Sequence, residues 1–121
     1  MDVETVDFVS VLTQDIPRAK RFYGETLGLP IETEGENDLE FTLGQVTLDV
    51  FNPASVGQEF APSPAGIAIR VPDVAAARAE LEAKGVQFDG EIVDTGVCHF
   101  AFFEDPDGNA LILHRRYEPY E

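Results

Sequence analysis

Alternating apolar and polar side chains open two similar stretches of the chain, and a helical pattern follows each of them. Each alternating run is followed by an acid, Asp15 or Asp73, of the type that caps the N-terminus of a helix. Apolar side chains then recur every three to four residues, and Gly28 or Gly85 ends the helical pattern. The offset of 58 that carries Asp15 onto Asp73 predicts that the same strand–helix unit occurs twice.

Further apolar runs complete the predicted elements. Helices are expected from Asp15 to Leu27 and from Asp73 to Lys84. Strands are expected at 6–12, 39–43, 46–51, 66–71, 86–92, 97–103 and 110–115. The acidic segment 32–38 is interpreted as a connection, and the proline-containing segment 52–64 as a linker. The prediction is one α+β domain, residues 1–121, built from two βαβββ modules at about 6–51 and 66–115. Two similar halves can enclose a ligand cleft between them.

Composition narrows the class of protein. The chain has eight Lys and Arg residues and 23 Asp and Glu residues, which gives a formal net charge of −15. Such a surface repels nucleic-acid phosphates and anionic lipid, so we expect neither as a partner. The charge could attract a cationic ligand, it could only keep the surface solvated, or it could reflect a salt-rich cytoplasm. The single cysteine, Cys98, the absence of an apolar run of membrane-spanning length and the lack of a signal-like N-terminus favour a cytoplasmic protein.

Two local motifs add a family resemblance. The first helix ends in the Phe22–Leu29 sequence FYGETLGL, and the last two strands flank the turn DPDGN at Asp105–Asn109. With the doubled pattern, these motifs resemble the vicinal oxygen chelate superfamily, which includes glyoxalase I, extradiol dioxygenases and bleomycin-resistance proteins. The resemblance spans about residues 6–115. It implies paired βαβββ modules whose curved sheets enclose a cavity, in a homodimer.

The resemblance also implies four inward strand positions at which metal-dependent members carry ligands. In this chain these positions fall on Phe8, Asp49, Gly66 and Ile112. A catalytic divalent ion needs about three protein ligands, and three of these residues have no donor side chain. We therefore expect no metal and no cofactor.

The same positions predict which side chains line the cavity, because residues two apart on a strand share a face. The expected lining is Phe8, Ser10, Leu12, Thr47, Asp49, Phe51, Gly66, Ala68, Arg70, Ala110, Ile112 and His114. The opposite face is aliphatic and is expected to pack under the helices; it consists of Val9, Val11, Leu48, Val50, Ile67, Ile69, Leu111 and Leu113. A mostly apolar cavity with few polar groups is typical of a small-molecule site.

Four polar residues are candidates for chemistry. His114 could move a proton or donate a hydrogen bond, or it could be an inert histidine at a strand end. Asp49 could pair with Arg70, attract a cation or serve as a base. Arg70 could hold a carboxylate or enolate oxygen, or be a rim arginine. His99 lies on the partner strand of the last hairpin and could lie beside His114, although the unknown register leaves its face open.

Other reactive or aromatic residues favour structural roles. Neighbours on a strand point to opposite faces, so Cys98 and His99 are not expected to form a nucleophilic pair, and Cys98 is interpreted as a buried cysteine. Phe100, Phe102 and Phe103 are interpreted as core. The acids of Asp105–Asn109 are interpreted as turn formers, because no bidentate Glu follows at calcium-loop spacing.

Three functions remain open at this stage. The first is a metal-independent, bleomycin-resistance-like protein that binds a small organic molecule, which could be cationic. Its ligand-binding residues would be Phe8, Ser10, Asp49, Phe51, Arg70, His99, Ile112 and His114. The second is a cofactor-free lyase or isomerase that uses His114 or Asp49 as its catalytic residue. The third is a metal-dependent lyase or dioxygenase with a shifted site at Asp49, His114 and His99.

Overall fold

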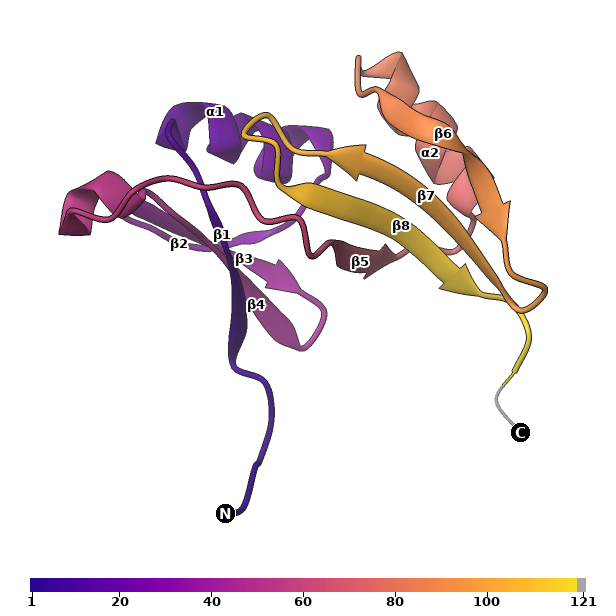
Figure 1. Ribbon diagram of the computed structural model, residues 1–121, viewed down its shortest axis with the longest axis horizontal. Coiled ribbons are helices and arrows are strands. Elements are labelled where there is room, and N and C mark those ends of the chain that lie inside the picture. Colours follow the sequence, from indigo (N-terminus) through magenta and orange to yellow (C-terminus); the bar gives the residue numbers. More distant parts are fainter. Residues whose placement is uncertain (120–121) are drawn as a thin grey trace. The chain divides into compact units, whose positions relative to one another are not determined.

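The computed structural model describes residues 1–119 and divides the chain into two compact units, residues 1–62 and 63–121. Each unit is a four-stranded mixed sheet with helical segments packed on it (Figure 1). The predicted α+β architecture of two βαβββ modules is confirmed.

Unit 1 begins with strand β1 (Phe8–Leu12), followed by helix α1 (Ile16–Lys20) and a π-helical turn η1 (Arg21–Thr26). Strands β2 (Ile31–Glu34), β3 (Asp38–Leu43) and β4 (Val46–Phe51) complete the sheet, whose order is β1-β4-β3-β2. The 3-10 helix η2 (Pro53–Val56) follows. The prediction that residues 32–38 form only a connection is wrong for residues 32–34, which belong to β2. There β2 pairs with β3 as an exposed edge strand, which has no apolar periodicity because neither face is buried.

The N-cap predicted at Asp15 is present in unit 1. Its carboxylate accepts a hydrogen bond from the backbone N–H of Arg18 at 3.0 Å. At the other end the N–H of Leu27 donates to the carbonyl of Phe22, and Gly28 then leaves the helix with φ of +75°. Tyr23 of this helical segment is fully buried, with its ring 5.8 Å from that of Phe41.

Unit 2 repeats the plan with β5 (Ile67–Arg70), α2 (Val74–Ala83), β6 (Phe88–Asp94), β7 (Cys98–Glu104) and β8 (Ala110–Arg116). Its sheet order is β5-β8-β7-β6. Asp73 caps α2 by accepting from the N–H of Ala76 at 3.0 Å. Helix α2 packs on β6, β7 and β8, with Val74 and Leu81 buried.

The turn between β7 and β8 is built as the sequence predicts. One oxygen of the Asp105 carboxylate accepts from the N–H groups of Asp107 and Asn109, both at 2.9 Å. The other accepts from the side-chain amide of Asn109 at 2.8 Å. The amide oxygen of Asn109 in turn accepts from the N–H of Ser63 at 2.8 Å. These bonds join the turn to the segment that leads into β5.

The helix-facing side of both sheets is the aliphatic set expected from the alternation. Leu48, Val50, Leu111 and Leu113 are buried, and Val11 is 3% exposed. Val9, Ile67 and Ile69 are half-buried. The predicted lining residues therefore lie on the other side of each sheet, which we call the open face of unit 1 and the open face of unit 2.

Candidate functional site

Strand pairing aligns the two open faces position by position. In unit 1, β1 and β4 pair Phe8 with Thr47, Ser10 with Asp49 and Leu12 with Phe51. In unit 2, β5 and β8 pair Ala68 with Ile112 and Arg70 with His114. The repeat thus places Asp49 and Ile112 at equivalent points, and likewise Phe51 and His114.

The open face of unit 1 is acidic and rich in hydroxyl groups. The Ser10 hydroxyl donates to an oxygen of Asp49 at 3.0 Å. Glu40 of β3 stands opposite Asp49 and accepts from the hydroxyl of Thr33 at 3.0 Å. Partial burial is the largest cause that raises the pKa of Asp49 above its ordinary value, Ser10 opposes this rise, and the charges of nearby acids add to it. Asp49 is therefore both an acceptor and a candidate base.

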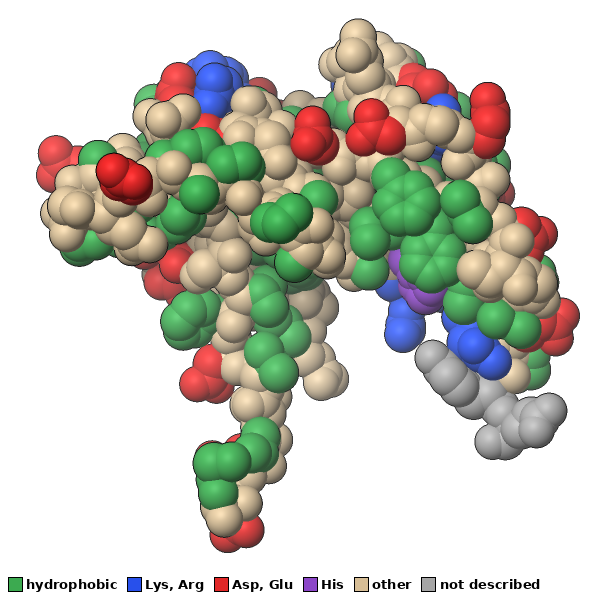
Figure 2. Space-filling model, in the orientation of Figure 1, with side chains coloured by type: hydrophobic (Ala, Val, Ile, Leu, Met, Phe, Trp, Pro, Cys, Tyr) green, Lys and Arg blue, Asp and Glu red, His purple; other side chains and the backbone are tan. Residues whose placement is uncertain are grey.

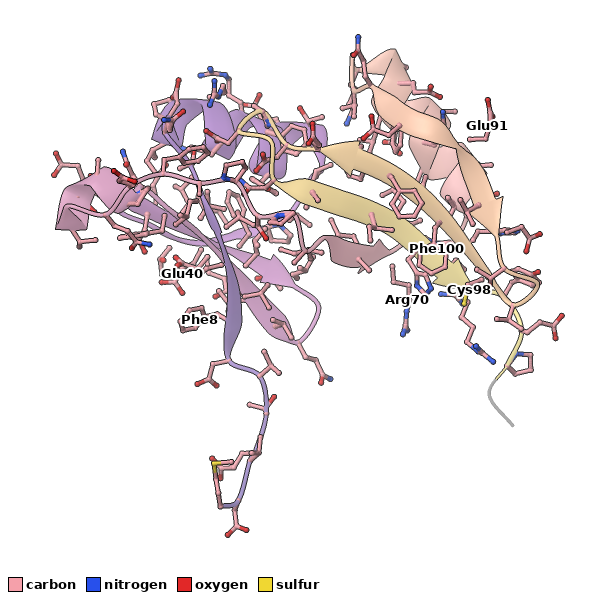
Figure 3. All side chains as sticks on the ribbon, viewed as in Figure 1. Phe8, Glu40, Arg70, Glu91, Cys98 and Phe100 are labelled. Atoms are coloured by element: carbon pink, nitrogen blue, oxygen red, sulfur yellow. The ribbon has the colours of Figure 1, made fainter. Side chains whose placement is uncertain are left out.

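Glu40 was not predicted from the sequence to be a site residue. The alternation of Leu39, Glu40 and Phe41 puts Glu40 on the polar side of its strand, but nothing local places it beside Asp49. Figure 3 shows Glu40 and Phe8 on the same side of the unit 1 sheet. Phe8 is 59% exposed.

The open face of unit 2 is aromatic and basic. Phe100 of β7 pairs in register with His114, which pairs in register with Arg70. The Phe100 and His114 rings are 4.7 Å apart in an edge-to-face arrangement, and those of Phe100 and Phe102 are nearly parallel at 6.1 Å. Figure 2 shows hydrophobic side chains over β7 and β8 with a histidine at their border.

The interpretation of three phenylalanines as core is correct for Phe103 alone. Phe103 is 1% exposed, whereas Phe102 is 36% exposed and Phe100 is half-buried. A run of three aromatic residues within four positions necessarily uses both faces of a strand. Cys98, interpreted as buried, is half-exposed and shares the open face with Phe100 (Figure 3).

His99 does not lie beside His114. It pairs in register with Arg115 and so belongs to the opposite face of the sheet. There its Nε2 lies 3.4 Å from an oxygen of Asp94, and its ring lies 4.6 Å from that of Tyr117. The Tyr117 hydroxyl donates to Asp94 at 2.7 Å, and this bond is the main cause that raises the pKa of Tyr117 to about 12. The structure thus separates His99 from the other predicted ligand-binding residues of unit 2.

The four strand positions that the family resemblance marks for metal ligands offer few donor side chains. Among Phe8, Asp49, Gly66 and Ile112, only Asp49 has an oxygen in its side chain. Gly66 has φ of +82°, and a Cβ there would lie 3.1 Å from Cδ1 of Ile112, so a ligating side chain does not fit without strain. Within residues 1–119, no three His, Cys, Asp or Glu side chains gather where they could share a metal ion. These residues do not fit the metal site of the metal-dependent enzymes.

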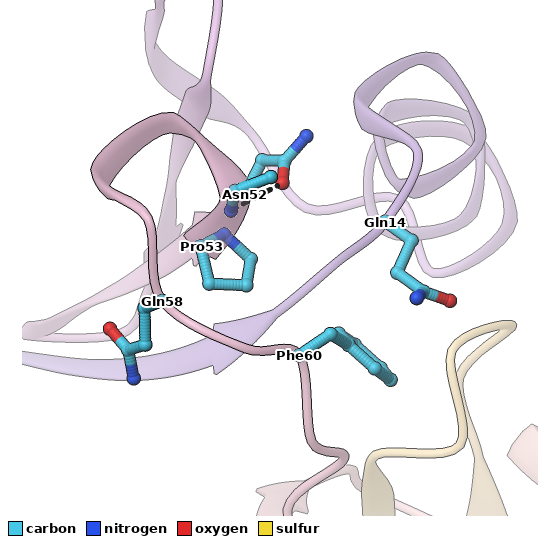
Figure 4. Close-up of a pocket in the computed structure, with 6 residues that line it drawn as sticks. Gln14, Asn52, Pro53, Gln58 and Phe60 are labelled. Atoms are coloured by element: carbon cyan, nitrogen blue, oxygen red, sulfur yellow. Dashed lines mark hydrogen bonds between the residues drawn. The ribbon is translucent and has the colours of Figure 1, made fainter.

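Unit 1 also contains a pocket that the sequence analysis did not anticipate. It has a volume of about 340 Å³ and lies at the end of β4, in part of the segment interpreted as a linker (Figure 4). Its lining residues are Gln14, Asn52, Pro53, Ala54, Gln58 and Phe60. The side-chain oxygen of Asn52 accepts from the N–H of Ala54 at 3.1 Å. Amides can bind a polar group here, but no lining side chain is suited to proton transfer.

No helix in the described part of the chain is long and apolar enough to cross a membrane.

Solved structures of similar fold carry several different functions. TnmS3, an antibiotic binding protein from Streptomyces sp. CB03234, has a TM-score of 0.79 and 29% identity, with 96% of this chain and 98% of that chain covered. A lactoylglutathione lyase from Agrobacterium tumefaciens has a TM-score of 0.80 at 16% identity, with 93% and 94% covered. A glyoxalase/bleomycin resistance protein/dioxygenase from Nocardioides has a TM-score of 0.77 at 16% identity, with 100% and 92% covered.

Sequence comparison points to the same group of proteins. No curated protein sequence matches the chain. The family model of the Glyoxalase/Bleomycin resistance protein/Dioxygenase superfamily matches residues 5–113, nearly the whole length. The resemblance inferred from the repeat and the two motifs is therefore confirmed, and this chain belongs to the Glyoxalase/Bleomycin resistance protein/Dioxygenase superfamily.

Proposed function

We propose that this protein binds a small organic molecule against the open faces of its sheets and that it does so without a metal ion. The observation that carries the proposal is the combination of side chains on those faces. They offer exposed aromatic groups and a few polar ones, as small-molecule sites do. They also lack donors at three of the four positions where the metal-dependent relatives hold their ion. The 29% identity to an antibiotic binding protein supports a binding role.

Charge on the open face of unit 1 favours a cationic group in the ligand. Asp49 and Glu40 stand side by side, and Asp38 lies in the next row, opposite Phe51. Like charges this close raise the free energy of the empty face, and a bound cation relieves that repulsion. The raised pKa of Asp49 is consistent with this repulsion.

Thermal unfolding of the full chain tests the proposal. A ligand that binds the folded chain alone stabilises it by about 2.7 kcal/mol at a hundred times its dissociation constant. We expect the unfolding temperature to rise with at least one compound from a panel of cationic glycopeptides and planar aromatic drugs. The rise should be the same in EDTA and in added zinc. A panel without any stabilising compound, or a rise that needs metal, contradicts the proposal.

A matched pair of variants tests the cationic preference. Asp49→Asn and Glu36→Gln remove the same charge, but Glu36 is an exposed acid in the turn between β2 and β3, outside the open face. Asp49→Asn should weaken binding of a cationic ligand several-fold, and Glu36→Gln should not. Equal effects would mean that net charge alone attracts the ligand.

Proton transfer is a second candidate function, favoured by the raised pKa of Asp49. A cofactor-free lyase or isomerase could use Asp49 or His114 as its base. The test is proton exchange at the carbon beside the carbonyl of small ketones and 2-oxo acids in D₂O, followed by NMR. Exchange that His114→Ala or Asp49→Asn abolishes in a folded protein would support this function. Exchange that persists in both variants would remove these residues from the mechanism.

A homodimer remains our expectation for the assembly, as the family resemblance implies. Phe8 and Phe102 are large apolar side chains exposed in the single chain, and such groups are often covered by a partner. Light scattering would test this by giving either one or two times the mass of the chain.

A further inference from the structure

We propose that the open face of unit 2 recognises a planar aromatic molecule that carries an acidic oxygen. This inference rests on the small-molecule binding proposed above and gives this face the opposite charge preference from the open face of unit 1.

Three rings form a continuous aromatic surface on this face. Phe100 and Phe102 are two residues apart on β7, so they share a side of the strand, and their ring planes are within 9° of parallel. His114 of the neighbouring strand β8 adds its ring against Phe100. Because paired aromatic rings gain stabilisation beyond that of the area they bury, a planar aromatic ligand gains more here than an aliphatic one.

Arg70 supplies the charge. It is exposed, and no acid within the described part of unit 2 forms an ion pair with it. Strand pairing puts it opposite His114, at one edge of the aromatic surface, and Figure 3 shows it near Phe100. A guanidinium is planar and fits the two oxygens of a carboxylate, or a phenolate beside a carbonyl.

The acids of this face lie away from Arg70. Asp89 pairs in register with Phe102, and Glu104 with Ala110, one and two rows further along the sheet. In a chain of net charge −15, Arg70 gives this edge of the face a positive charge. A positive charge at this edge favours an acidic substituent on the ligand over a cationic one.

The test uses three probes of similar size with the full chain, followed by ¹⁵N NMR titration. The probe 1-hydroxy-2-naphthoate has both the ring and the acid, 1-naphthylmethylammonium has the ring with a cation, and decahydro-2-naphthoate has the acid without aromaticity. We expect the first to bind about tenfold more tightly than either of the others and to shift the amides of β7 and β8. Equal or tighter binding of the ammonium or the decahydro compound overturns the proposal.

Two pairs of variants locate the binding. Arg70→Gln should weaken binding of 1-hydroxy-2-naphthoate about tenfold, whereas Arg115→Gln removes the same charge from the opposite face and should not. Phe102→Ala should weaken it about three- to tenfold, and Tyr117→Ala, an aromatic deletion on the opposite face, should not. Equal effects within either pair overturn the assignment to this face.

These outcomes distinguish failure of the aromatic-acid proposal from failure of the general proposal that the chain binds a small molecule. If the panel of compounds stabilises the chain but 1-hydroxy-2-naphthoate does not bind, the binding function stands and the aromatic-acid assignment fails. If no compound of any class binds, both fail. If Phe102→Ala changes a dimer into a monomer while affinity is unchanged, a second copy of the chain covers this face and the inference is wrong.

Discussion

Single residues decide what each open face can do, and Gly66 shows this most directly. Its φ of +82° suits glycine, and Ile112 fills the space into which a side chain would point. The equivalent position in unit 1 is Phe8, whose side chain is exposed. The two units therefore differ at this matched position. Unit 1 has an exposed phenylalanine side chain there, whereas unit 2 has a glycine whose side-chain space is filled by Ile112.

Gly66→Ala should lower the free energy of unfolding by more than the roughly 1–2 kcal/mol that a left-handed alanine costs. The excess reflects the contact at 3.1 Å between the new Cβ and Ile112. Gly28→Ala is the control, because φ is +75° there and no atom lies within 4 Å of the added Cβ. Urea unfolding of both variants measures the difference. Equal losses would show that Ile112 moves aside freely.

Asp49 makes stability depend on pH. Its pKa in the fold is raised above the usual 3.8, so the folded chain holds the proton more tightly than the unfolded chain. Stability contributed by Asp49 is therefore full below the unfolded pKa and is lost as pH rises through the folded pKa. Asp49→Asn should gain stability relative to the natural chain as the pH rises from below the ordinary pKa of 3.8 to neutral.

Urea unfolding across that pH range measures the gain. Ser10→Ala provides a second readout, because the Ser10 hydrogen bond lowers the pKa of Asp49. Its loss should raise the pKa further and steepen the fall in stability with pH. A difference between Asp49→Asn and the natural chain that does not change with pH would contradict the shift.

Elements are held in place by a few buried polar contacts, and the β7–β8 turn depends on Asn109. This side chain is fully buried, donates to Asp105 and accepts from the N–H of Ser63. Removing it leaves a buried carboxylate oxygen and a backbone N–H each with one partner fewer. The same amide thus fixes the hairpin and the chain entering β5.

Asn109→Ala should cost about 2–4 kcal/mol of unfolding free energy. Amide hydrogen exchange should speed up at Ser63 and across the β7–β8 turn more than elsewhere. Glu104→Gln, which changes an exposed side chain at the end of β7 beside this turn, should stay within about 0.5 kcal/mol of the natural chain. A small loss for Asn109→Ala would mean that water replaces both bonds.

At the scale of the whole molecule, the high negative net charge affects stability. A net charge of −15 on 121 residues destabilises the compact state by self-repulsion, which salt screens. The urea midpoint should rise between about 0.01 M and 0.5 M sodium chloride, over which the screening length falls from about 30 Å to a few ångströms. A double variant, Glu36→Lys and Glu59→Lys, changes two exposed acids and should show a weaker rise. A midpoint that falls with salt would contradict the argument.

Much of the fold was predictable because its signals are local. Asp15 and Asp73 cap helices as expected, and the aliphatic sides of β4 and β8 pack under α1 and α2. Strand β2 escaped prediction because an exposed edge carries no apolar alternation. The bound ligand, the catalytic roles of His114 and Asp49, and the homodimer stay predictions.

The sequence by itself determined the repeated order of strand and helix, the helix caps and the alternation of faces along the first strand of each unit, since these follow from spacing along the chain. The tertiary structure alone decided which side chains meet across strands. It put Glu40 beside Asp49 and Phe100 between His114 and Phe102, and it put His99 on the opposite face. The reason is physical: register is set by hydrogen bonds between strands distant in sequence, and a shift of one residue would exchange every neighbour.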